Sequence, residues 1–208
     1  MAIENPESLE DIVGHQDKKP TFQKYIEIGE IVTDLMFSGP PGVGKSAIAQ
    51  ILQKETTSGE INRRRIVCGE TKNKGEDNTP RNVREKIGDS LDKLPLMNDP
   101  HNVVILEEFD SFKKDEQKKF KGLFEREGNA RIILVTNHPE DIPEPVKSRF
   151  KQFRFSNLED EEIRELAKRF EEEKSLDVEE KTVELIVNKA DGDARTAIQE
   201  LKELKARL

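Results

Sequence analysis

The sequence has very few of the residues that cross-link a chain or stack on nucleic-acid bases. Its 208 residues include one cysteine, Cys68, one tyrosine and no tryptophan. A single cysteine excludes both a disulfide framework and a cysteine-based zinc site. Cys68 itself fits a small apolar residue at a strand end. The scarcity of tyrosine and tryptophan argues against base stacking as the main mode of nucleic-acid binding.

Long apolar runs and a net positive charge are also missing. No segment approaches the ~20 apolar residues that cross a bilayer, and the N-terminus lacks the apolar stretch of a signal peptide. We therefore expect a soluble protein without membrane contact, cytoplasmic, or nuclear if the source is eukaryotic. Asp and Glu total 43 against 35 Lys and Arg, a formal net charge of −8. Any contact with DNA must then come from a local basic stripe.

One glycine-rich segment matches a phosphate-binding pattern at every position. It follows the apolar run 35–37 and consists of Gly39, Pro40, Pro41, Gly42, Val43, Gly44, Lys45 and Ser46, the P-loop pattern G-x-x-x-x-G-K-[ST]. In such a loop the backbone N–H groups and the start of the next helix bind phosphate oxygens. Lys45 would reach the β- and γ-phosphates, and the Ser46 hydroxyl would bind Mg²⁺. The alternative is a Gly/Pro turn that precedes a helix by chance.

Apolar strands alternate with amphipathic helices up to about residue 156, and only helices follow. The expected strands are 35–37, 65–68, 103–106, 131–136 and 152–155, and the later helices are 160–173, 178–189 and 193–208. Near-continuous apolar strands separated by helices indicate a parallel sheet covered on both faces. We expect an α/β nucleotide-binding domain over 1–156 and a small helical domain over 157–208.

The strand 103–106 ends in two acids, Glu107 and Glu108. This places carboxylates at the C-terminal edge of the sheet, where the P-loop also lies. In P-loop ATPases the first acid helps to hold Mg²⁺ and the second polarises the attacking water. The first acid is usually Asp, and Glu107 is one methylene longer, so it would coordinate with shifted geometry or through a water. The alternative is that both acids merely solvate a strand end.

In their order along the chain, several motifs resemble those of the AAA+ ATPases. Within that family they are most similar to clamp-loader subunits of the replication factor C small-subunit type. The motifs are 6–14 (PESLEDIVG), the P-loop, 81–88 (RNVREKIG), the acidic strand end, 136–137 (TN), 148–150 (SRF) and 192–195 (GDAR). The resemblance extends over nearly the whole chain. It implies an AAA+ parallel sheet flanked by helices, a small α-helical lid domain, and ATP with Mg²⁺ as ligands.

The resemblance also implies roles for single residues. Asn137 corresponds to the first sensor, which contacts the γ-phosphate or the attacking water, and Arg195 to the second sensor. Arg149 corresponds to the arginine finger, which acts on ATP held by a neighbouring subunit. Ile12 and Val13 would flank the adenine. The alternatives are a turn-forming asparagine, two solvated arginines and two core residues.

Residues 111–127 are expected to form a helix with a buried aromatic stripe. Lys114, Lys118 and Lys121 would lie on another face at helical spacing. In clamp loaders the corresponding helix follows the phosphate backbone of primer–template DNA, and Arg84 would extend this track through further phosphate contacts. Interleaved acids leave a solvated charged face as the alternative.

The implied function is an ATP-hydrolysing subunit that joins sister AAA+ subunits in a ring-like assembly and loads a sliding clamp onto primed DNA. Two alternatives are an AAA+ switch that remodels a protein or helicase partner, and a P-loop small-molecule kinase. Clamp-loader subunits carry a third, collar domain, whereas this sequence stops at Leu208. We therefore expect either a truncated form or a compact relative, such as a virus-encoded loader subunit.

Overall fold

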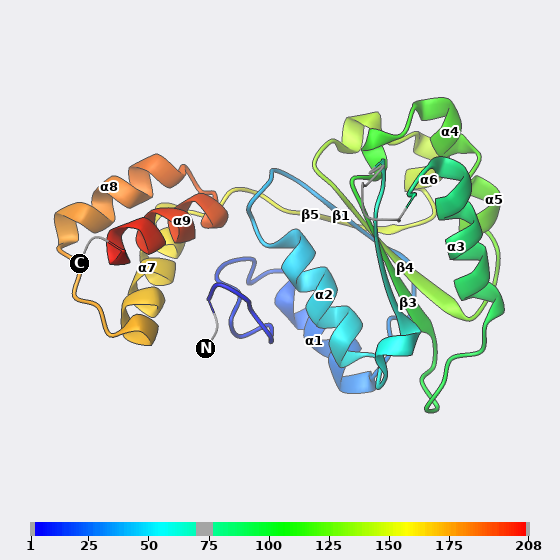
Figure 1. Ribbon diagram of the computed structural model, residues 1–208, viewed down its shortest axis with the longest axis horizontal. Helices are drawn as coiled ribbons and strands as arrows, with labels where there is room; N and C mark the ends of the chain where they lie inside the picture. The colour runs from blue at the N-terminus through cyan, green and yellow to red at the C-terminus, as the bar shows by residue number, and fades with distance from the viewer. Residues whose placement is uncertain (1–2, 70–76, 207–208) are drawn as a thin grey trace.

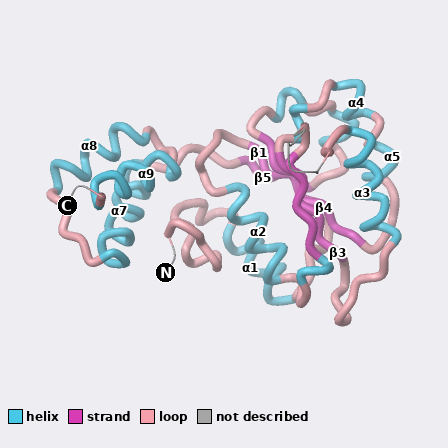
Figure 2. The backbone as a smooth tube through the Cα atoms, viewed as in Figure 1, coloured by secondary structure: helices cyan, strands magenta, loops and turns pink. Residues whose placement is uncertain are grey.

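The computed structural model describes residues 3–69 and 77–206, which form a sheet-containing body and a smaller body of helices (Figures 1 and 2). The larger body is built on a five-stranded sheet with the order β2-β3-β4-β1-β5. Its strands, all paired in parallel, are β1 (Leu35–Ser38), β2 (Arg63–Val67), β3 (Asn102–Glu107), β4 (Ala130–Thr136) and β5 (Lys151–Arg154). The expected parallel α/β fold is confirmed, and each expected strand is found within two residues of its predicted bounds.

The central strands carry the longest apolar runs because helices cover both of their faces. Along β3, Val103 and Ile105 pack with the first two helices of the chain, whereas Val104 and Leu106 pack with the helices on the opposite face. Those first two helices are α1 (Lys19–Ile28) and α2 (Lys45–Glu55). The opposite face is covered by α3 (Pro80–Asp92), α4 (Lys114–Lys118), α5 (Lys121–Phe124) and α6 (Glu144–Lys147), as Figure 1 shows. The single 3₁₀ turns are η1 (Glu60–Asn62), η2 (Phe109–Ser111) and η3 (Pro139–Asp141).

The expectation of one helix over 111–127 is wrong. The segment consists of the end of η2, an extended residue at Phe112, and the two short helices α4 and α5. Aromatic packing accounts for the breaks, because the chain must turn to bring its phenylalanines together under the sheet. The Phe120 ring lies 5.0 Å from that of Phe109 and 5.8 Å from that of Phe112, measured between ring centroids. In one straight helix Phe112 and Phe120 would be about 12 Å apart along the axis, too far for this ring contact.

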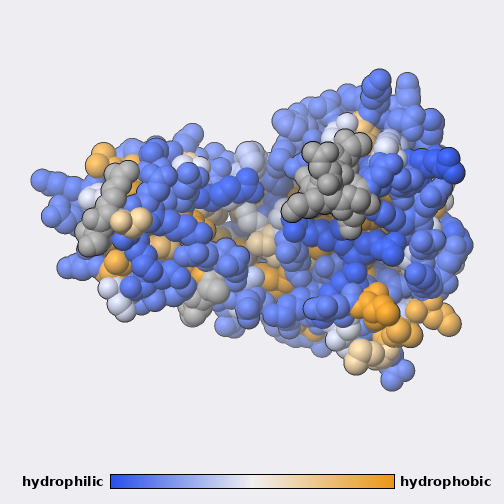
Figure 3. Space-filling model, viewed as in Figure 1, coloured by the Kyte–Doolittle hydropathy of each residue, from blue (hydrophilic) through white to orange (hydrophobic). Residues whose placement is uncertain are grey.

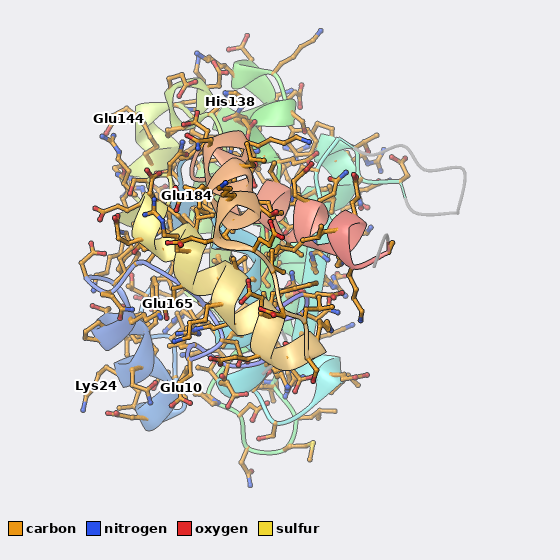
Figure 4. All side chains as sticks on the ribbon, turned by 90° about the vertical axis from the view of Figure 1, so that its left-hand side faces the viewer. Glu10, Lys24, His138, Glu144, Glu165 and Glu184 are labelled. Atoms are coloured by element: carbon orange, nitrogen blue, oxygen red, sulfur yellow. The ribbon has the colours of Figure 1, made fainter. Side chains whose placement is uncertain are left out.

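The smaller body consists of α7 (Asp160–Lys174), α8 (Glu180–Ala190) and α9 (Ala194–Lys205). These helices enclose their own apolar core, to which Ile3 and Val13 of the N-terminal segment also belong. Their outer face is strongly charged (Figure 4), with Glu184 paired to Arg164 across α7 and α8. No helix within the described residues is long and apolar enough to cross a membrane.

Candidate nucleotide-binding site

A cavity of about 1000 Å³ lies where the carboxyl ends of the strands meet the C-terminal helices. The surface is indented between the two bodies in the space-filling view (Figure 3). Most of the predicted site residues line this cavity: Ile12, Val13, Pro41, Gly42, Val43, Gly44, Lys45, Ser46, Glu107, Glu108, Asn137 and Arg195. Parallel strands bring them together, because Glu107 at the end of β3 pairs in register with Val135 of β4, two residues before Asn137.

Lys45 is buried at the start of α2, with 5% of its surface exposed. Its ammonium donates hydrogen bonds to the Gly39 carbonyl, at 2.8 Å, and to the Pro40 carbonyl. Burial, followed by the charge of Arg195, lowers the pKa of Lys45 to about 8, against the opposing effect of two nearby aspartates. Two cations therefore face one small space, an arrangement that favours an anionic ligand.

Asp193 lies directly over the P-loop, which sequence reasoning did not foresee. A Cβ atom placed on Gly42 would fall 1.8 Å from its Oδ1 atom. The same carboxylate caps α9 by accepting hydrogen bonds from the backbone N–H groups of Arg195, at 2.8 Å, and Thr196, at 3.1 Å. Asp193 thus lies between α9 and the loop, and it fixes the turn that carries Arg195. The sequence contained one indication of the capping role: an acidic residue immediately before a segment with helical spacing of apolar residues, which is typical of a helix N-cap.

Glu107 is buried and forms an ion pair with Arg65. Arg65 is the second residue of the site, after Asp193, that was not predicted from the sequence. The Arg65 Nη2 and Nε atoms lie 2.7 and 3.1 Å from Oε2 of Glu107. The other carboxylate oxygen, Oε1, is buried and has no hydrogen-bond partner among the described residues. Arg65 precedes by two residues Val67, which pairs with Glu107 across β2 and β3, so both charged side chains lie on the same face of the sheet.

Glu108 and Asn137 occupy the turns that follow β3 and β4. Glu108 has a left-handed backbone, with φ +55°, and its N–H group donates to the Val135 carbonyl at 3.2 Å. The Thr136 hydroxyl donates to Oδ1 of Asp110 at 2.5 Å, which ties the end of β4 to the acidic turn after β3. The side chains of Glu108 and Asn137 are therefore held on adjacent turns at one wall of the cavity.

A third unforeseen contact supports the P-loop from the N-terminal segment. The Nε2 atom of His15 lies 2.8 Å from the Val43 carbonyl oxygen, which requires the proton to be on Nε2. Burial lowers the pKa of His15, so its ring is neutral near pH 7. The ring also packs edge-on against Phe155, with centroids 4.8 Å apart. His15 thus anchors the loop backbone beside the phosphate-binding positions.

The remaining predicted residues lie elsewhere. Arg149 is not among the described residues that line the cavity, and its guanidinium pairs with Glu125. Because residues 111–127 are not one helix, the predicted lysine stripe does not exist in the form expected. Each of the three lysines is paired with a carboxylate: Lys114 with Asp141 at 3.2 Å, Lys118 with Asp115 at 3.0 Å, and Lys121 with Glu125 at 3.6 Å. Arg84 is half-buried on α3.

Residues 35–158 match the family model described as "ATPase family associated with various cellular activities (AAA)". The chain belongs to the AAA family of ATPases. The match covers the segment that contains the P-loop, the acidic end of β3 and Asn137, and it confirms the ATPase class and nucleotide binding expected from the sequence.

The replication factor C small subunits of three archaea are similar to this AAA protein. That of Methanococcus vannielii is 31% identical over 95% of this chain and 61% of the relative. That of Natronomonas pharaonis is 30% identical over 95% and 59%, and that of Staphylothermus marinus 27% over 97% and 60%. The chain therefore spans about three fifths of the length of these relatives.

Among solved structures, one titled as the Thermotoga maritima RuvB Holliday junction branch migration motor aligns with 97% of this chain and 65% of its own. The TM-score is 0.73 at 19% identity. A point mutant of the same RuvB gives a TM-score of 0.75 at 18% identity, over 97% of this chain and 66% of its own. At such identity the likeness concerns the fold alone.

Proposed function

We propose that this protein is an ATP-binding and ATP-hydrolysing subunit of a DNA sliding-clamp loader, which places a ring-shaped clamp on primed DNA. One observation carries the proposal: the P-loop, the two glutamates, Asn137 and Arg195 meet at a single cavity. The similarity to replication factor C small subunits over nearly all of this chain supports the choice of the clamp loader among AAA functions.

The residues at the cavity fit ATP with Mg²⁺. The P-loop amides and the Lys45 ammonium would hold the phosphates, and Ile12 and Val13 would flank the adenine. Ser46 and the unpartnered Oε1 atom of Glu107 offer hard oxygen ligands, which Mg²⁺ prefers. When bound, the ion would neutralise charge on the phosphates.

The chain's own catalytic groups are assigned as follows. Glu108 would accept a proton from the attacking water and orient it, which its place on the cavity wall allows. Asn137, on the neighbouring turn, would hold the water or the γ-phosphate by a hydrogen bond. Arg195 would approach the phosphates from α9. We place the boundary between the nucleotide-binding domain and the lid domain at residues 156 and 157.

Arg149 would act in trans on ATP held by a sister subunit. Its position outside the cavity of its own chain is what such a role requires. Its pair with Glu125 would open on assembly, which the partial exposure of both side chains, 38% and 36%, permits at little cost. An isolated chain would then bind ATP but hydrolyse it slowly, since an arginine finger contributes about 10³–10⁵ in rate.

An exposed apolar patch is a suitable surface for the clamp. It consists of Ile61, Leu94, Leu96 and Met97, which are 51–76% exposed. Two hydrogen bonds between the Asn62 side chain and the Leu96 backbone hold its two segments together, at 2.8 and 3.0 Å. Exposed apolar patches commonly mark interaction sites. These residues precede β2 and β3, at the end of the sheet opposite the nucleotide, so both ligands could bind at once.

The test is the ATPase rate with and without primed DNA and the sliding clamp of the same source, together with the particle mass in ATP. Stimulation by both ligands is expected. A double change, Leu94→Ser with Met97→Ser, should remove the response to the clamp. Leu185→Ser provides the matched control, because Leu185 is 70% exposed on α8, outside the patch. An ATPase that responds to neither ligand would contradict the proposal.

The ion pairs of Lys114, Lys118 and Lys121 favour a second candidate. Each lysine lies within 3.6 Å of a carboxylate, which offsets the charge that phosphate contacts would use. An AAA+ switch that acts on a protein partner needs no such stripe. Under this second candidate, the partner would stimulate the ATPase and primed DNA would have no effect. We keep DNA binding by these lysines and Arg84 as a prediction, to be measured by the salt dependence of binding.

A further inference from the structure

The ion pair between Arg65 and Glu107 links an edge strand to the buried end of its neighbour. The Arg65 side chain is 49% exposed, whereas that of Glu107 is only 10% exposed. The guanidinium therefore extends from the open side of β2 toward a carboxylate that water scarcely reaches. Both residues line the nucleotide cavity, together with Ser46. Arg65 is thus part of the wall in which the metal ligands of the proposed function lie.

The pair is asymmetric, and its asymmetry indicates a ligand. The Nε and Nη2 atoms of Arg65 both lie within 3.1 Å of one oxygen of Glu107, Oε2. The other oxygen, Oε1, is buried without a hydrogen-bond partner among the residues that the structure describes. A buried acceptor without a partner is destabilising unless a ligand or water occupies it. A carboxylate oxygen in a cavity that is also lined by Ser46 and the P-loop is a suitable ligand for a hard divalent cation.

Arg65 also restricts a side chain that would otherwise be loosely placed. Glutamate has one more methylene group, and so one more rotatable bond, than the aspartate usual at this position. Two N–H groups on Oε2 fix the carboxylate at one end and leave one oxygen for a metal ion. The guanidinium also adds a permanent positive charge beside the site, which weakens the attraction of a free cation for the carboxylate.

We propose that Arg65 is a positioning residue that presents only Oε1 of Glu107 to the metal ion of the bound nucleotide, and so selects Mg²⁺ over Ca²⁺. The proposal rests on the nucleotide site of the proposed function and deepens it. Mg²⁺ demands near-ideal octahedral geometry from single oxygens, whereas Ca²⁺ accepts carboxylates through one or both oxygens. Blocking Oε2 therefore removes the two-oxygen mode that suits the larger ion.

The test compares wild type with Arg65→Leu in the binding of a fluorescent, non-hydrolysable ATP analogue, titrated with Mg²⁺ and separately with Ca²⁺. Removal of Arg65 should tighten the apparent affinity for Ca²⁺ relative to Mg²⁺ by about tenfold, because Oε2 becomes free for the two-oxygen coordination that suits Ca²⁺. The loss of the positive charge acts on both divalent ions alike and does not change their ratio. Arg64→Leu is the matched control, since Arg64 donates to the Lys86 carbonyl on the other face of the sheet. An unchanged Ca²⁺ to Mg²⁺ ratio in Arg65→Leu, or an equal change in Arg64→Leu, would overturn the proposal.

Two further measurements separate positioning from general structure. In a Glu107→Gln background, Arg65→Leu should no longer change the metal ratio, and any remaining change would argue against action through Glu107. A double-mutant cycle for urea unfolding in EDTA should also show coupling between Arg65 and Glu107 without metal or nucleotide. That coupling does not depend on clamp loading. The cycle would therefore still report on Arg65 if the clamp and DNA failed to stimulate the ATPase, and absence of coupling would refute the pair itself.

Discussion

The contact between Asp193 and the P-loop can be measured by substitution of two glycines in the same loop. Gly42 and Gly44 both have left-handed backbones, with φ of +75° and +92°. A Cβ atom on Gly42 would lie 1.8 Å from Oδ1 of Asp193, whereas one on Gly44 would have no atom within 4 Å outside its chain neighbours and its own helix. Gly44→Ala therefore introduces backbone strain alone. Gly42→Ala introduces the same strain and also displaces the Asp193 carboxylate.

The expected losses in the free energy of unfolding follow from the backbone strain and from the displacement of the Asp193 carboxylate. A non-glycine residue in the left-handed region costs about 1–2 kcal/mol, which is the whole effect expected for Gly44→Ala. Displacing a packed side chain adds about 1–3 kcal/mol for Gly42→Ala. Asp193→Ser should recover most of this second part, because serine is shorter and still caps α9. We therefore expect a coupling free energy of about 1–3 kcal/mol between Gly42→Ala and Asp193→Ser, and none between Gly44→Ala and Asp193→Ser.

The assay is urea unfolding of the nucleotide-free protein, with free energies obtained by linear extrapolation. Circular dichroism should follow both bodies, since each contains helices. If Gly42→Ala cost no more than Gly44→Ala, the Asp193 carboxylate would not fill the space above the loop. If Asp193→Ser failed to restore stability to Gly42→Ala, the excess cost would come from the loop itself rather than from the contact with Asp193.

Three further outcomes are expected. Lys45→Ala should abolish ATP binding in calorimetry, because it removes the loop's buried ammonium. Arg149→Ala should leave binding intact and reduce hydrolysis only in assemblies with sister subunits, and an equal loss of binding in both variants would contradict this division of roles. Asp34→Asn tests a pH effect: burial raises the pKa of Asp34 from 3.8 to about 6, so its ionisation disfavours the fold as pH rises through this window. The amide can still accept the Ile132 N–H, now 2.9 Å from Oδ1, so the free energy of unfolding should rise by about 1–3 kcal/mol at pH 8 and little at pH 4, whereas an equal change at both would exclude titration of Asp34 as the cause.

The sheet could be predicted from the sequence because its central strands are apolar on both faces. Helices cover β3 and β4, so 103–106 and 131–136 are near-continuous apolar runs that no surface helix would show. The helix expected over 111–127 failed for a different reason. Its phenylalanines do follow helical spacing, but they bury their rings by turns of the chain, and the spacing of apolar residues cannot distinguish these two solutions.

The residues of the site also fall into two groups: those that a short sequence motif predicts, and those whose place depends on contacts between distant segments of the chain. The P-loop and the acids at the end of β3 could be predicted because each lies at the carboxyl end of a strand, and parallel strands end at one edge of the sheet. Asn137, which follows β4, was indicated by the resemblance to the AAA+ ATPases. Arg65 could not be predicted, because its partner is chosen by the register of β2 on β3 and lies 42 residues away. Asp193 was likewise hidden: its capping role is local, but its contact with Gly42 depends on how α9 packs over the loop. The residues that we propose to bind the nucleotide can thus be found from short motifs, whereas those that we propose to orient them require the tertiary structure.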